Sequence, residues 1–125
     1  MSLSETKTEK EEALLAKVCG HRLTSVDFVL DYLILGFDGK GALTTMVWPE
    51  ILEVNSLLKF GMKEYRDRLC ALITEVVRAV TVSADQTILI SFRNEAVLRI
   101  PLNSRKASGE KAIFTAPKHH LYVWS

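Results

Sequence analysis

Two adjacent histidines, His119 and His120, are the residues whose types most readily suggest metal chemistry. A metal site needs ligands that converge on one point, whereas neighbouring residues of a strand project to opposite faces. A joint ligand role would therefore require a loop after Pro117. The thiol of Cys19 and the imidazole of His21 lie close in sequence, but no second cluster completes a four-ligand zinc set. We expect no metal site and no cofactor.

The sequence lacks the usual catalytic patterns. It contains no Gly-x-Ser-x-Gly motif, no phosphate-binding glycine loop and no dinucleotide fingerprint. Four aspartates lie in or beside predicted turns, where aspartate has a structural role: Asp27, Asp31, Asp38 and Asp85. No residue is predicted to be catalytic, so a non-enzymatic function is favoured. A small enzyme without a recognisable motif is the last alternative.

Aromatic residues are the first candidates for binding. Four of them are predicted to be partly exposed at the rim of the core: Trp48, Tyr65, Tyr122 and Trp124. Aromatic residues often anchor protein interfaces, although packing at the rim of the core is the simpler role. An open sheet also has edge strands that can pair with a second chain, so self-association is the simplest version. We select Trp48, Tyr122 and Trp124 as candidate binding residues.

A basic stretch near the C-terminus is the second candidate. Between Arg99 and Lys118, five basic residues accompany the single carboxylate of Glu110. With nearby aromatic side chains, this mixture resembles the groups that hold nucleic-acid backbones and stack bases, and we select Arg105 and Lys106 as contacts. The net charge of only +1 argues against a nucleic acid as the main partner. Binding of nucleic acid or another anionic ligand is therefore the alternative function.

Length and composition describe a globular chain. The 125 residues suffice for one domain, and 48% hydrophobic with 25% charged residues argues against disorder. Apolar runs are shorter than the roughly 18–20 residues that span a bilayer, and Met1 to Lys7 lacks the pattern of a signal peptide. We expect a cytoplasmic protein with no membrane partner. Cys19 and Cys70 are expected to be reduced, buried thiols.

The apolar patterns predict an α+β fold, mainly antiparallel sheet with two helices. One-sided apolar stripes predict helices at residues 9–19 and 63–74, the second with a surface ion pair between Glu64 and Arg68. Alternation predicts a hairpin around the turn Arg93-Asn94-Glu95. Strands are predicted at residues 23–30, 32–37, 42–48, 75–83, 87–93, 96–102, 111–115 and 120–124. Residues 50–61 are ambiguous: residues 50–54 fit a helical turn, and residues 57–60 fit a short strand.

The two halves of the chain resemble each other. A shift of 54 positions places Leu15 on Leu69, and a shift of 55 places Phe37 on Phe92. These matches predict an internal duplication, about residues 8–61 and 62–125, with two helix-plus-meander halves in one sheet system. A chance match between two helix–hairpin stretches is the alternative explanation. A plain sheet with two helices on one face and a partly closed barrel are the alternative architectures.

The tail Gly109–Pro117, followed by His120–Trp124, and the turn Phe37-Asp38-Gly39 carry a family resemblance. They resemble small bacterial domains with a repeated strand–turn–strand unit, some of which act as immunity proteins beside polymorphic toxins. The resemblance implies a protein partner and brings no catalytic residue. In the second half the turn Arg93-Asn94-Glu95 has no Asp-Gly pair like Asp38-Gly39 of the first, so the turn motif repeats imperfectly. We therefore predict a single domain, residues 1–125, that works as a protein-binding module.

Overall fold

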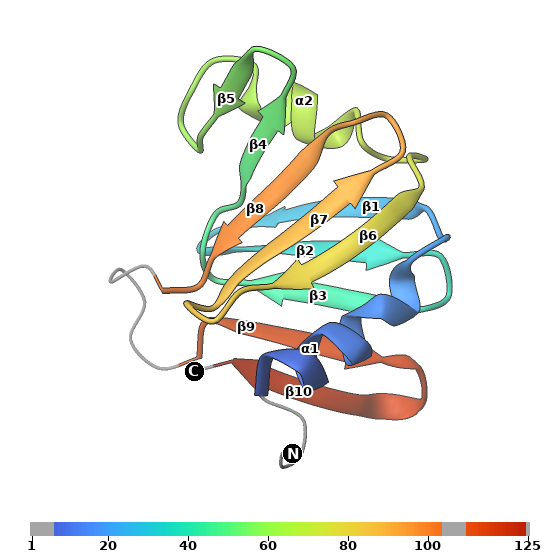
Figure 1. Cartoon of the computed structure of the whole chain (residues 1–125). Helices are drawn as coiled ribbons and strands as arrows, with labels where there is room; N and C mark the ends of the chain where they lie inside the picture. The colour runs from blue at the N-terminus through green and yellow to red at the C-terminus, as the bar shows by residue number, and fades with distance from the viewer. Residues whose placement is uncertain (1–6, 104–109, 125) are drawn as a thin grey trace.

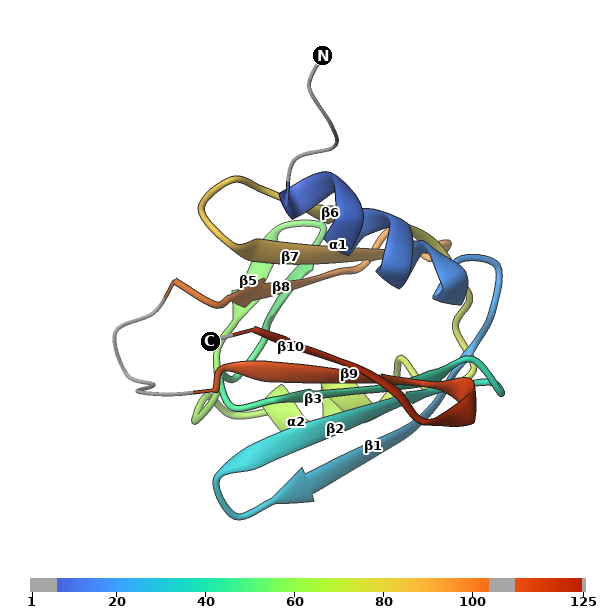
Figure 2. The ribbon, with the colours of Figure 1, turned by 90° about the horizontal axis from the view of Figure 1, so that it is seen from below.

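The protein consists of two facing antiparallel sheets with short helices at their open sides (Figures 1 and 2). The computed structural model describes residues 7–103 and 110–124. Across the first sheet the order is β1 (Leu23–Val29), β2 (Tyr32–Phe37), β3 (Gly41–Thr45), β9 (Ala112–Ala116) and β10 (His120–Trp124). Across the second it is β5 (Ser56–Leu58), β4 (Glu50–Glu53), β8 (Val97–Pro101), β7 (Thr87–Phe92) and β6 (Val77–Val82). The predicted α+β class is confirmed, as two open sheets in place of one sheet system or a barrel.

Both predicted helices form, but they are shorter than expected. α1 (Lys7–Leu15) continues into a 3-10 turn, η1 (Ala16–Val18), and α2 spans only Tyr65–Cys70. The left-handed backbone of Glu64, with φ 72°, delays the start of α2. Neither helix is long and apolar enough to cross a membrane in the part of the chain that the structure describes.

The helical turn predicted at residues 50–54 is wrong. These residues form β4, where Ile51 pairs with Leu98 of β8 and with Leu58 of β5. A short apolar run cannot reveal by its spacing alone whether it is a buried strand or a helical turn. Here the pairing with β8, which lies far away in the sequence, makes this segment a strand.

Strand alternation builds one core between the sheets. In β2 and β7 every second side chain is buried, ending in Phe37 and Phe92, and the helices add Leu15 and Leu69 to the same cluster. Because side chains of a strand alternate between its faces, the other half of each strand forms the outer face of a sheet. Outward-facing positions and loops are therefore the places to seek a functional site.

The two meanders, β1–β2–β3 and β6–β7–β8, are built on the same register. Leu23 pairs with Phe37 and Val77 with Phe92, and a bulge follows in both cases. The hairpin that follows each meander joins the opposite sheet: β4–β5 extends from β8, and β9–β10 extends from β3. Direct backbone bonds join the halves, including Val77 N–H to His21 O at 2.9 Å. The internal duplication itself stays a prediction.

Two predictions about side chains are corrected. Arg68 bonds through Nε to Glu53 Oε1 at 3.1 Å, and not to Glu64, because β4 lies beside the helix. Cys70 is exposed and Cys19 half-buried, both as free thiols, so the expectation of two buried thiols is wrong. Cys70 is the last residue of the short α2 helix, where its side chain is exposed.

Candidate protein-binding surface

Exposed apolar side chains gather in one short segment of the second sheet and the loop after it. Seven large apolar side chains are exposed among the described residues, and four of them lie between residues 54 and 62. These four are Val54, Leu57, Phe60 and Met62, with Phe60 44% and Met62 47% exposed. Exposed apolar surface often marks an interaction site, so this segment is the first candidate.

Phe60 belongs to a row of aromatic rings. Its ring lies nearly parallel to that of Trp48, with centroids 4.2 Å apart and an interplanar angle of 14°. Trp48 in turn stacks on Phe28 of β1 at 6.2 Å and 20°. We call Phe28, Trp48 and Phe60 the ring row. Three rings from separate segments thus form one rigid apolar surface.

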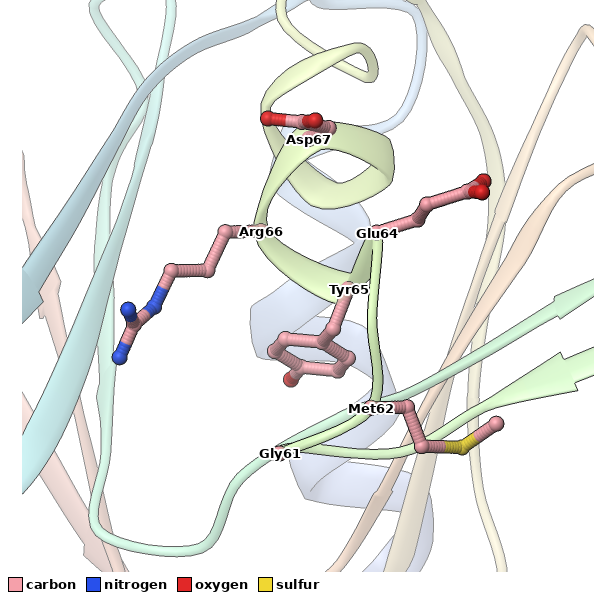
Figure 3. A pocket seen from close by; sticks show the side chains of 6 residues that line it. All are labelled: Gly61, Met62, Glu64, Tyr65, Arg66 and Asp67. Atoms are coloured by element: carbon pink, nitrogen blue, oxygen red, sulfur yellow. The ribbon is translucent and has the colours of Figure 1, made fainter.

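Arg66 of α2 completes this surface. Its guanidinium carbon lies 5.6 Å from the ring centroid of Phe28 and 5.8 Å from that of Phe60, within cation–π range. Figure 3 shows Arg66 extended away from α2, on the side opposite to Glu64. Arg66 makes no ion pair with any carboxylate in the described ranges. Its hydrogen-bonding capacity therefore remains open to a partner.

A buried tyrosine holds the surface together. The hydroxyl of Tyr65 donates to the carbonyl oxygen of Pro49 at 2.5 Å, and its ring meets Phe60 edge-on at 5.8 Å. Burial, reinforced by the charge of Glu50, raises the pKa of Tyr65 well above its usual value. The neutral hydroxyl ties α2 to the segment that carries Trp48. The surface is thus pre-organised before any partner arrives.

Two shallow cavities flank the loop between β5 and α2. One, shown in Figure 3, has a volume of about 290 Å³ and is lined by Gly61, Met62, Glu64, Tyr65, Arg66 and Asp67. The other, of about 260 Å³, is lined by Met46, Val47, Trp48, Glu50, Lys59, Phe60 and Pro101. Both fall just below the roughly 300–1,000 Å³ of small-molecule pockets. Their size suits single side chains of a protein partner.

Of the three predicted aromatic binding residues, only Trp48 lies on this surface. Trp124 is 1% exposed at the end of β10, where its side chain points between the sheets. Tyr122 is half-buried, lies edge-on against Trp124 at 4.7 Å, and donates its hydroxyl to Glu11 Oε2 at 2.7 Å. The expected partial exposure is wrong for Tyr65 and Trp124, because both side chains fill the core.

The predicted basic contacts Arg105 and Lys106 lie outside the described residues. Arg99, from the same stretch, is engaged on the outer face of the second sheet, with Nη1 2.8 Å from Glu50 Oε1. His120 is exposed at the start of β10. Within residues 7–103 and 110–124, His, Cys, Asp and Glu side chains form no group of three that could hold a metal ion.

Sequence reasoning missed Phe60, Met62 and Arg66. Leu57 and Leu58 are adjacent, a signal that one of them must face outward from so short an edge strand, and Phe60 and Met62 follow among polar and small residues. The position of Arg66 over Phe28 and Phe60 could not be predicted from the sequence pattern, because it depends on how α2 packs against the sheets. Comparisons with protein-family models, curated proteins and solved structures found no match to this chain.

Proposed function

We propose that this chain is a cytoplasmic, non-enzymatic protein-binding module whose partner binds over the ring row and Arg66. The exposure of Phe60, which stacks on the half-buried Trp48, and of Met62 in the same loop is the observation that carries the proposal. Aromatic, methionine and arginine side chains are the types enriched in protein interfaces. An immunity-like role, with a toxin as partner, is a narrower version of the same proposal.

Charge indicates what the partner should offer. The nearby carboxylates Glu50 and Glu53 already form ion pairs with Arg99 and Arg68. The positive charge of Arg66 is therefore left for the partner. We infer a segment that places an apolar side chain beside Phe60 and a carboxylate on the guanidinium group, a geometry that arginine recognises well.

A capture experiment with a matched pair of variants tests the proposal. Tagged wild-type protein, Phe60→Glu and Leu30→Glu are incubated with native lysate, with and without nuclease. Leu30 is the control because it is apolar and 92% exposed at the β1–β2 turn, outside the surface. We expect a stoichiometric protein that is bound by wild type and Leu30→Glu and lost by Phe60→Glu. Capture that survives in Phe60→Glu would refute this surface.

The same samples separate the alternatives. Material that disappears after nuclease treatment would favour nucleic-acid binding. Sedimentation of the purified protein tests self-association, and a dimer that dissociates in Phe60→Glu would identify a second copy as the partner.

Trp124→Phe leaves Trp48 as the single tryptophan of the chain. Partner binding should then change the emission of Trp48 directly.

A further inference from the structure

A cavity of about 510 Å³ lies at the opposite end of β3 from Trp48. Its walls come from three segments: the turn after α1, the β2–β3 turn and the connection between β9 and β10. Figures 1 and 2 both place these segments at the same end of the molecule. The lining residues are Lys17, His21, Lys40, Ala116, Pro117, Lys118 and His120. We call this the basic cavity.

The charge of the basic cavity has one sign. Among the residues that the structure describes, three lysines and two histidines line it, and no carboxylate does. None of the three lysines forms an ion pair within residues 7–103 and 110–124. Asp38, exposed in the same turn as Lys40, is not among the lining residues. Like charges that converge without internal compensation create a favourable position for an anion.

The backbone holds together two of the turns that carry these lysines. Gly41 has φ 116°, and a Cβ there would lie 2.5 Å from the carbonyl oxygen of Thr115. The start of β3 therefore lies directly against the end of β9, which brings the turn with Lys40 beside the turn with Lys118. Lys118 itself has a left-handed backbone, with φ 69°. Lys40 and Lys118 thus line the cavity from two turns that are held together.

An apolar hollow adjoins the basic cavity. It has a volume of about 460 Å³ and shares Ala116, Pro117 and Lys118 with its neighbour. The rest of its lining is Phe37, Gly39, Gly41, Ala42 and Thr115. A ligand that spans both would meet cations at one end and an apolar wall at the other.

We propose that these adjoining cavities bind a small molecule that carries a doubly charged anionic group, of the phosphate monoester class, next to a short apolar body. Both are open depressions of the surface, and their volumes of about 510 and 460 Å³ lie within the size range, roughly 300–1,000 Å³, of small-molecule sites. An extended nucleic acid requires a basic track along its backbone, whereas these cations converge on one hollow in a chain of net charge +1. The site is independent of the ring row.

Calorimetry with defined probes tests this inference. Phenyl phosphate and methyl phosphate are titrated at constant ionic strength into wild type, Lys40→Ala, Lys118→Gly and Lys10→Ala. Glycine at position 118 suits the left-handed backbone, and Lys10 is an exposed lysine of α1 outside the cavity. We expect one saturable site that prefers phenyl phosphate. Each cavity variant should weaken it roughly tenfold, as expected for loss of a charge-assisted hydrogen bond, and Lys10→Ala should change it less than about twofold.

Three results would overturn the inference. The first is equal weakening by Lys10→Ala, which would indicate a general charge effect. The second is the absence of saturable phosphate binding in folded wild-type protein. The third is tighter binding of a single-stranded oligonucleotide or of anionic lipid vesicles that the same cavity variants abolish, which would assign the cations to a macromolecule. Unchanged melting temperatures of the variants exclude loss of folding as the cause.

Discussion

The β2–β3 and β7–β8 turns close matching hairpins with the same bond but with different backbones. In each, a backbone N–H returns to the phenylalanine that ends the strand: Lys40 to Phe37 at 2.9 Å and Glu95 to Phe92 at 3.1 Å. The first turn has positive φ at Gly39 and Gly41, whereas the second has it at Glu95. The turn of the first hairpin borders the basic cavity, and that of the second carries an exposed Arg78–Glu95 ion pair.

The difference teaches that the core fixes the register while the turns remain free to vary. Phe37 and Phe92 are both buried, so a slip of one residue would move each of them to the outer face. No such constraint acts on exposed turn residues such as Lys40. Candidate sites therefore occur where the halves differ, and stability should depend on where they agree.

The largest expected effect concerns the matched phenylalanines. Phe37→Ala and Phe92→Ala should each lower the free energy of unfolding by about 3–5 kcal/mol, since each empties a large buried volume. Leu30→Ala, at an exposed turn, should change it by less than about 0.5 kcal/mol. Urea unfolding followed by circular dichroism measures all three. A loss below about 1 kcal/mol at only one phenylalanine would end the equivalence of the two positions.

The second prediction separates the turns. Gly41→Ala should cost about 2–3 kcal/mol, because the residue has φ 116° and its new methyl group would press on the carbonyl of Thr115. Ala96, its counterpart after the β7–β8 turn, has no positive φ, and Ala96→Gly should cost only about 1 kcal/mol. The same unfolding assay compares them. Equal losses would contradict the close approach of β3 to β9.

Local pattern predicted much of this fold, because inward-facing positions repeat with the period of the strand. The buried alternation of β2, β7 and β8, the tight turn at Asp31 and the glycine turn at Gly39 follow from it. The local pattern did not predict that β4–β5 pairs with β8, or that β9–β10 pairs with β3. Those pairings join segments far apart in the sequence, and no local period encodes a distant partner.

The candidate sites were less accessible to sequence reasoning for the same reason. Trp48 was selected by type alone, whereas Phe60 stacks on it, and Arg66 lies over Phe60, only through the docking of the segment that contains α2. The sequence indicated a linear basic stretch near the C-terminus. In the structure, Lys17 and Lys40 from the first half join Lys118 around one cavity. Charge that converges in space need not be contiguous along the chain.

The smallest expected effects concern the tyrosines that anchor the helices, one for each helix. Tyr122 donates to the buried carboxylate of Glu11 on α1, whose Oε1 has no hydrogen-bond partner among the described residues. Tyr65 of α2 donates to the neutral carbonyl of Pro49. Tyr122→Phe should therefore cost about 2 kcal/mol, because it strips a buried charge of its donor, and Tyr65→Phe about 1 kcal/mol. Denaturant unfolding at neutral pH measures the difference.

The dependence of stability on alkaline pH tests the bond between Tyr122 and Glu11 separately. Burial, together with the hydrogen bond to Glu11 and its charge, raises the pKa of Tyr122 from 10.0 to about 12. A pKa that is raised by folding stabilises the protein fully below the unfolded value and loses that contribution as pH rises through the folded value. The free energy of unfolding should thus fall between pH 10.0 and about 12, and fall less steeply in Tyr122→Phe. If wild type and Tyr122→Phe lose stability in parallel over this range, the bond to Glu11 does not hold α1 in solution. Only α2 would then be anchored by a tyrosine.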